Sequence, residues 1–236
     1  IVPYITSKFD VFLANDIMRP IIAQATSSFK FRQIMDEQKI LLVNLSKGRL
    51  GDLNANLIGL ILVGKILMAA LSRSDGLGRS PTGELAPFYL YIDEFQNITT
   101  DSIATILSEA RKYKLSLNVA HQFIAQLEEK IRDAVFGNIG SIAAFRVGVD
   151  DAEYLEKQLA PVFKAHDVLN LDNHNAYLRL LVNGRPVKPF NIQTLPPPPV
   201  DLTIIDKLKE LSYLKFGRAH SDIEAEIMAR YKKTPW

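Results

Sequence analysis

The sequence predicts an α/β fold with a mostly parallel β-sheet covered by helices. From residue 88 onward, short apolar segments alternate with segments that have helical periodicity. The expected strands, such as FYLYID at 88–93 and SIAAFRV at 141–147, are largely apolar along their length rather than at every second position. Strands buried on both faces have this composition, and they occur mainly in parallel sheets flanked by helices.

The expected elements follow one another along the chain, beginning with two short amphipathic segments at residues 10–18 and 29–37. The expected strands lie at residues 39–45, 88–93, 115–121, 141–147, 175–182 and 187–192. The expected helices lie at residues 52–73, 99–113, 123–135 and 150–160. Asp150 and Glu153 have the spacing of a capping box, and NGRP at 183–186 predicts a hairpin turn.

Composition divides the chain into four segments. A helical lead-in covers residues 1–38 and the α/β core covers residues 39–195. The run of four prolines is stiff and non-helical, so residues 196–200 are expected to link the core to a helical tail at 201–236. The mixed charges of the tail favour a solvated helix packed on the body over a helix that docks a partner.

Composition also excludes several kinds of site. The 236 residues include no cysteine, which rules out disulfides and cysteine metal sites and fits a reducing cytosol. The four histidines lack the spacing of metal ligands. A net charge of +2 gives no signal for polyanion binding over the whole chain, so any contact with nucleic acid must be local.

The most apolar stretch, residues 57–71, is expected to be a buried helix. It is 15 residues long and carries Lys65 near its middle, whereas a membrane span needs about 20 apolar residues. We therefore expect no membrane span in this sequence. The chain begins with Ile1 rather than methionine, which indicates a piece of a longer protein.

Polar side chains follow the strands of the alternating region. Asp93 and Glu94 follow its first strand, Gln122 follows the second, Arg146 lies at the end of the third, and Arg111 ends the intervening helix. Ligands of open α/β sheets bind beyond the carboxyl ends of the strands. We therefore expect these side chains to reach one ligand.

These residue types match the parts that nucleoside triphosphate hydrolysis requires. Asp93 would hold magnesium through water, and Glu94 would activate the attacking water. Gln122 would sense the γ-phosphate. Arg111, acting within its own subunit or in a neighbouring one, would offset the charge that develops on the transferred phosphoryl group.

Each residue also has an ordinary structural interpretation. An acidic pair after a strand is often a helix cap, a glutamine there is usually a surface residue, and Arg111 is a favourable charge near a helix C-terminus. Arg146 within an apolar strand needs a partner, for which Asp150 and Asp151 are candidates. Because all of these residues lie where one ligand could contact them, together they favour an ATPase site over a separate structural role for each.

The sequence contains no phosphate-binding loop. Such a loop requires GxxxxGK followed by serine or threonine, because its amides hold phosphate and its hydroxyl binds magnesium. SKGRLG at 46–51 has Lys47 before its first glycine and Asp52 after its second, and an aspartate there would repel phosphate. A turn between a strand and a helix is the expected role of this segment.

Several separate blocks resemble a known family. YIDEFQN, SEARKY, NVAHQ, FGNIG and FRVGVDDAEYL occur in the order found in the C-terminal half of the motor domain of TraG/TraD-like type IV secretion coupling proteins. KILLVNLSKGRLGD and the apolar helix after it are similar to the strand and helix that precede the acidic motif in that family. The resemblance covers roughly residues 10–195.

The resemblance implies a RecA-like core without its Walker A half, from a hexameric ATPase of the HerA/FtsK superfamily that delivers DNA to a conjugation channel. Asp93 and Glu94 match the Walker B pair, with Asp93 holding Mg²⁺ through water, and Gln122 matches a nucleotide-sensing glutamine. Arg111, with Arg146 as a second candidate, matches the arginine that acts across the subunit interface. ATP and Mg²⁺ belong to the longer protein, and this piece alone is expected to bind neither tightly and to be inactive.

The same resemblance implies a homohexamer whose partners are DNA, single-stranded or bound to a relaxase, and components of the secretion channel. It implies a cytoplasmic location, at the inner face of the cytoplasmic membrane if an N-terminal part anchors it there. Two alternatives stay open. One is a non-catalytic adaptor that recognises relaxosome or secretion partners, and the other is a HerA-like genome or protein translocase.

Overall fold

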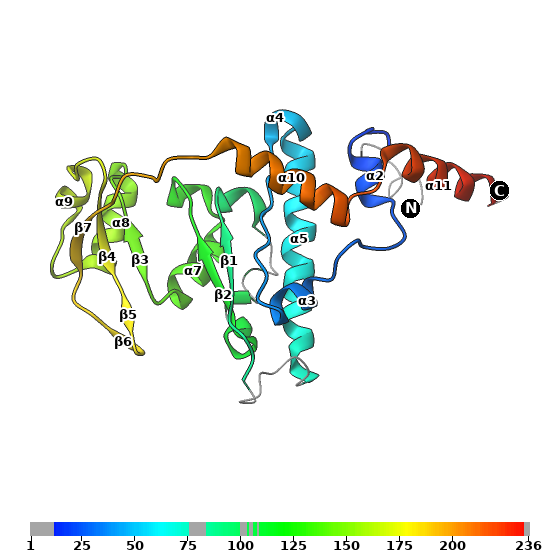
Figure 1. Ribbon diagram of the computed structural model, residues 1–236. Coiled ribbons are helices and arrows are strands. Elements are labelled where there is room, and N and C mark those ends of the chain that lie inside the picture. Colours follow the sequence, from blue (N-terminus) through cyan, green and yellow to red (C-terminus); the bar gives the residue numbers. More distant parts are fainter. Residues whose placement is uncertain (1–11, 76–83, 100–102, 104–105, 108, 234–236) are drawn as a thin grey trace. The chain divides into compact units, whose positions relative to one another are not determined.

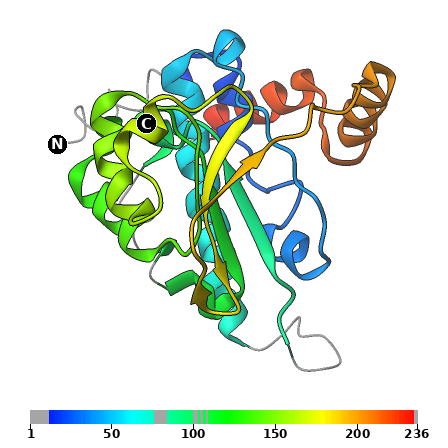
Figure 2. The ribbon, with the colours of Figure 1, turned by 90° about the vertical axis from the view of Figure 1, so that its left-hand side faces the viewer.

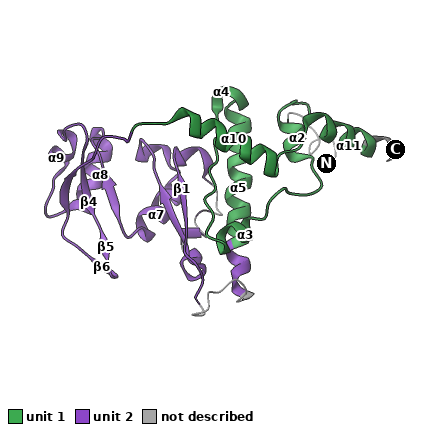
Figure 3. Ribbon diagram, viewed as in Figure 1, with its two compact units in different colours: residues 1–69, 199–236 green, residues 70–198 purple. Residues whose placement is uncertain are grey.

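The computed structural model describes residues 12–75, 84–99, 103, 106–107 and 109–233, and its chain forms two compact units. Unit 1 comprises residues 1–69 and 199–236, and unit 2 comprises residues 70–198 (Figure 3). The two units are described separately below.

Unit 1 is helical in its described part. Its helices are α2 (Met18–Ile22), α3 (Phe31–Asp36), α4 (Lys47–Leu50), α5 (Asp52–Ser72), whose last turn belongs to unit 2, α10 (Leu202–Phe216) and α11 (His220–Lys233) (Figure 1). The tail helix α11 packs on α2, where Arg19 Nε donates to Glu224 Oε1 at 3.0 Å and Arg230 Nη1 donates to the Ala23 carbonyl at 3.1 Å. Helix α10, in contrast, buries none of its residues.

Helix α5 is long and apolar enough to cross a membrane, judged by length and composition alone. An 18-residue window of it has a mean hydropathy of 1.9, and 33% of that window is buried. The expectation of a buried helix therefore holds for one side of α5, which includes Ala55, Val63 and Ile66. Leu53 and Met68 are exposed.

The strand expected at residues 39–45 is not a strand in this structure. The segment is extended without ladder hydrogen bonds, and Ile40 and Leu42 are 87% and 82% exposed. Apolar composition favours a strand only where a neighbouring strand completes its hydrogen bonds. The turn expected next to it is present as the single helical turn α4, which ends at Leu50 and is followed by Gly51 with φ of +77°.

Unit 2 combines a parallel pair with an antiparallel sheet. Strands β1 (Phe88–Ile92) and β2 (Leu115–Val119) are parallel, with Phe88 opposite Leu115 and Ile92 opposite Val119. Strands β3 (Ile142–Ala144), β4 (Asn175–Arg179) and β7 (Phe190–Gln193) form an antiparallel sheet in the order β3-β4-β7. The α/β class is confirmed, whereas parallel pairing among the described strands is confined to β1 and β2.

The antiparallel pairing of β4 with β7 follows from the connection between them. Strand β4 returns to β7 through the short hairpin β5 (Leu181–Val182) and β6 (Arg185–Pro186), and antiparallel neighbours need only a short loop. Asn183 and Gly184 both have positive φ, as the predicted hairpin turn requires. Helices α8 (Val149–Leu159) and α9 (Ala165–Leu169) cover one face of this sheet (Figure 2).

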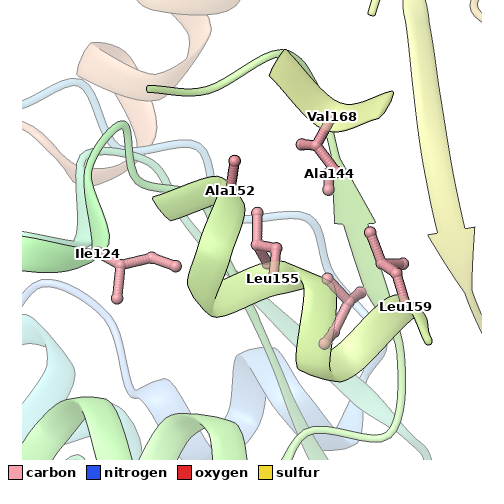
Figure 4. Packing of buried hydrophobic residues seen from close by; sticks show 7 residues of the cluster. Ile124, Ala144, Ala152, Leu155, Leu159 and Val168 are labelled. Carbon is pink, nitrogen blue, oxygen red and sulfur yellow. The ribbon is translucent and has the colours of Figure 1, made fainter. Parts of the chain in front are cut away.

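A hydrophobic cluster joins α8 to the strands and to the loop after β2. Its buried members are Ile124, Ile142, Ala144, Ala152, Leu155, Leu159 and Val168 (Figure 4). Helix α7 (Glu129–Asn138) and the 3₁₀ turns η2 (Phe95–Ile98), η3 (Ala110–Tyr113) and η4 (Ile124–Gln126) complete the described part of unit 2. Residues 100–102, 104–105 and 108 of the helix expected at 99–113 lie outside the described residues, whereas Ile103 and Ile106 are buried, as its periodicity predicted.

The capping box expected at Asp150 and Glu153 is wrong. Helix α8 begins at Val149, and its N-cap is Gly148, which has no side chain to cap it. Asp150 therefore lies within the first turn, where a negative charge interacts favourably with the helix dipole. Sequence analysis also missed the short helix α9.

Arg73 holds together the segments that lead into β1 and β2. It is fully buried, and it donates from Nη1 to the Tyr113 carbonyl at 2.9 Å and from Nη2 to the Ala86 carbonyl at 2.7 Å. Because Tyr113 precedes β2 and Ala86 precedes β1, one guanidinium fixes the amino ends of both parallel strands.

We expect Arg73→Ala to lower the free energy of unfolding by about 3 kcal/mol, because two partly buried carbonyls lose their charged donors and a fully buried side chain is removed. Urea unfolding followed by circular dichroism measures the change. Arg185→Ala, in the exposed hairpin, is the matched control and should change stability by less than about 0.5 kcal/mol. Equal effects of the two substitutions would contradict this role of Arg73.

Candidate active site

The carboxyl ends of β1 and β2 bring two loops together. Beyond the strands, Ala120 N donates to the Ile92 carbonyl at 2.9 Å, and Phe95 N donates to the Ala120 carbonyl at 2.9 Å. The side chain of Phe95 is fully buried and anchors the first loop. The residues that follow β1 therefore lie beside those that follow β2, as expected for parallel strands.

Glu94 has an unusual backbone conformation at this position. Its φ of 51° and ψ of 44° lie in the left-handed region, which costs a residue with a side chain roughly 1–3 kcal/mol. Its N–H donates to Asp93 Oδ1 at 2.9 Å. This reversal separates the buried Phe95 from the partly exposed Glu94, so that consecutive residues serve the core and the site.

Two side-chain amides hold the Glu94 carboxylate. Gln122 Nε2 donates to Glu94 Oε1 at 2.5 Å, across the two loops. Gln96 Nε2 donates to Oε2 of the same carboxylate at 2.6 Å. The structure thus brings together Glu94 and Gln122, which sequence analysis selected. It adds Gln96, which sequence analysis missed although its position two residues after Glu94 on a turn was a usable signal.

Arg111 lies elsewhere. It is exposed in η3, before the start of β2, whereas the acidic pair follows the end of β1. The five residues of β2 separate these two ends by about 16 Å at ~3.3 Å per residue. The expectation that Arg111 reaches the same ligand as Glu94 within one chain is therefore corrected.

Arg146 is not the buried arginine that its apolar surroundings suggested. It is exposed just beyond β3, and its Nη2 donates to Asn173 Oδ1 at 2.9 Å. The expected partners Asp150 and Asp151 do not form a hydrogen bond or ion pair with it among the described residues. The strand is shorter than predicted, so the arginine extends into solvent after it ends.

Asp151 instead anchors the loop that carries Gln122. It is 6% exposed, and its two carboxylate oxygens accept from Ile124 N at 3.2 and 3.1 Å. A buried carboxylate in the first turn of α8 is also favoured by the helix dipole. His121 belongs to the same loop, and burial lowers its pKa, with the Asp151 charge opposing that shift in part. The imidazole is therefore neutral at neutral pH.

Asp93 is the residue suited to a magnesium ion. Its carboxylate is exposed at the end of β1. No group of three or more histidine, aspartate or glutamate side chains that could enclose a metal occurs among the described residues. Mg²⁺ does not need such a group, because it keeps several waters and binds through one or two carboxylates together with substrate phosphates. A single exposed aspartate fits that pattern.

A family model covers the region that builds this site. Residues 87–159 match the family described as the TraM recognition site of TraD and TraG. That segment, about a third of the chain, is similar to this family. The matched segment runs from the start of β1 to the end of α8 and includes all five residues selected from the sequence. No curated protein matches the chain.

Solved structures are similar to part of the chain. The bacterial conjugative coupling protein TrwBdeltaN70, in its unbound monoclinic form, is 17% identical with a TM-score of 0.45, over 56% of this chain and 35% of that one. TrwB in complex with ADP and Mg²⁺ is 18% identical with the same TM-score, over 56% and 34%. The genome packaging NTPase B204 from Sulfolobus turreted icosahedral virus 2, in complex with AMPPCP, is 15% identical with a TM-score of 0.44, over 65% and 67%. The chain thus spans about a third of the TrwB chains.

We expect Asp151→Ala to lower the free energy of unfolding by about 1–3 kcal/mol, because Ile124 N–H loses its acceptor in a buried setting. Asp150→Ala, at the neighbouring exposed position, is the matched control and should cost less than about 1 kcal/mol. Hydrogen exchange at Ile124 should accelerate in the first variant only. Unchanged protection there would contradict the anchoring role.

Proposed function

We propose that this chain supplies the magnesium and water half of the ATPase site of a hexameric type IV secretion coupling protein that translocates DNA. The observation that carries the proposal is the 2.5 Å hydrogen bond between Glu94 and Gln122, which joins the loops at the carboxyl ends of two parallel strands. A carboxylate and an amide held together at that place suit a water-activating base and a sensor of the γ-phosphate. The match of residues 87–159 to a family of TraD and TraG supports the same conclusion.

Each residue has a defined part in this mechanism. Asp93 would hold Mg²⁺ through water, and the bound ion would neutralise charge on the phosphates. Glu94 would orient the attacking water and accept its proton, while Gln122 would link Glu94 to the γ-phosphate. Arg111 would act in the site of the neighbouring subunit, because it lies at the far end of β2 from its own Glu94. Arg146, exposed beyond β3, is the second candidate for that role.

The phosphates would be held by residues outside this sequence. The printed chain has no GxxxxGK[ST] segment. ATP and Mg²⁺ are therefore cofactors of a longer protein in this proposal, and its partners are further copies of itself, DNA and components of the secretion channel. The cytoplasm, at the inner face of the membrane, is the location that such partners require.

A second possible function is supported by a separate observation. The matched family is described by the recognition of TraM, a property stated for TraD and TraG. A non-catalytic adaptor that recognises a relaxosome protein would need no phosphate loop. A HerA-like genome translocase would share the site and differ in cargo. Substitution of Glu94 should abolish ATP turnover in a coupling protein and in a HerA-like translocase. A non-catalytic adaptor would have no turnover to lose.

In the full-length protein, we expect Glu94→Gln to retain ATP binding and to reduce turnover at least ~100-fold, because the amide cannot accept the proton of the attacking water. Steady-state ATP hydrolysis and nucleotide titration measure the two effects. Glu84→Gln, at an exposed position before β1, should leave turnover unchanged. Wild-type turnover in the Glu94 variant would refute the proposed site.

Mixing variant subunits tests where Arg111 acts. We expect Arg111→Ala and Glu94→Gln each to abolish most turnover, and a mixture of the two variants to regain part of it, because some interfaces then combine an intact Glu94 with an intact Arg111. Lys112→Ala, a change at the exposed neighbouring residue, should be active alone. No recovery on mixing would show that Arg111 serves its own subunit or has no catalytic part.

A further inference from the structure

The side chain of Gln96 has an orientation that its surroundings fix. Its Nε2 donates to Glu94 Oε2 at 2.6 Å, while its Oε1 is buried and has no hydrogen-bond partner among the described residues. An ionised carboxylate only accepts hydrogen bonds, so it must face the NH₂ group of the amide. The contact with Glu94 is thus maintained although it leaves a carbonyl oxygen unsatisfied, at a cost of about 1–3 kcal/mol.

One amide would not fix the Glu94 carboxylate. With Gln122 alone, the plane of the carboxylate could still turn about its last side-chain bond, because such terminal torsions have broad preferences. Gln96 holds the second oxygen from the turn η2, and Gln122 holds the first from the loop after β2. Two donors from different segments define the plane of the carboxylate.

The backbone removes the remaining freedom. Glu94 is left-handed, its N–H is bound to Asp93 Oδ1, and the next residue, Phe95, is buried. Each carboxylate oxygen can accept about two hydrogen bonds. Each amide occupies one of these positions, so the acceptor positions of the Glu94 carboxylate that remain open point in a fixed direction.

We propose that Gln96 is a positioning residue, which together with Gln122 forms a two-amide clamp that aims the Glu94 carboxylate at the attacking water. This inference rests on the proposed ATPase function and adds to it a residue that acts through Glu94 without touching the nucleotide. A displacement of about 1 Å at a reacting group costs as much as 100-fold in rate. Loss of the clamp should therefore reduce the rate of the chemical step more than the binding of ATP.

The test compares three substitutions of Gln96 in the full-length protein. Gln96→Leu keeps the approximate size and removes the donor, Gln96→Glu opposes the Glu94 charge, and Gln96→His retains an N–H donor. We expect kcat for ATP hydrolysis to fall about 10- to 100-fold for the leucine and glutamate variants, with KM changed less than 2-fold. The histidine variant should regain part of kcat.

The controls separate positioning from packing. Gln126→Leu makes the same change at an exposed glutamine of η4 and should leave kcat unchanged. A side chain that only fills space would be replaced better by leucine than by histidine, so a leucine variant at least as active as the histidine variant overturns the proposal. Thermal midpoints are measured for every variant. If Gln96→Leu does not fold, the comparison of the glutamate and histidine variants decides in the same way.

The outcome also distinguishes this inference from the proposed function. If Glu94→Gln keeps wild-type turnover, the ATPase site itself is refuted. If Glu94→Gln abolishes turnover while Gln96→Leu and Gln96→Glu match Gln126→Leu, the ATPase site stands and the clamp is refuted. Adding Gln96→Leu to Glu94→Gln should lower turnover no further, because the clamp acts only through the carboxylate.

Discussion

The parallel register of β1 and β2 determines which side chains meet at the candidate site. The pairing of Ile92 with Val119 ends both strands at the same level, and the bonds of Ala120 and Phe95 continue the ladder into the loops. Arg73 fixes the opposite ends of the two strands from a fully buried position. The distance between Glu94 and Gln122 is therefore set by backbone pairing rather than by the flexible side chains themselves.

The same loops show how a folded core supports polar chemistry at its edge. Phe95 and Ile124 are buried, and each lies one or two residues from a polar side chain of the site, Glu94 in the first loop and Gln122 in the second. Asp151 ties the second loop to α8 through Ile124 N. Hydrophobic burial thus holds the loop backbones in place, and the left-handed Glu94 is the strained residue that results. Strain of this kind is sustained because the surrounding packing over-determines the backbone.

Sequence periodicity predicted the parts of the fold that depend on local pattern and burial. The parallel pair and the contact of Glu94 with Gln122 follow from the alternation of strands and helices, and the hairpin at Asn183 and Gly184 follows from its turn residues. The absence of a strand at 39–45 could not be predicted, because a strand depends on a partner that composition does not reveal. Gln96 and Asp151 were missed for a related reason. Their roles depend on a left-handed turn and on the position of one backbone N–H, and neither leaves a repeating pattern in the sequence.

The charges of the candidate site bear on the proposed function. Among the described residues, no lysine or arginine forms an ion pair with Asp93 or Glu94, and the Glu94 carboxylate is held by neutral amides alone. Neutral donors orient a carboxylate without adding a positive charge beside it. Two further buried polar atoms near the end of β2, Asn118 Nδ2 and His121 Nδ1, also have no partner in the described part. In the proposed function, a magnesium nucleotide held by residues outside this sequence would bring the positive charge and polar groups that these side chains leave unmatched.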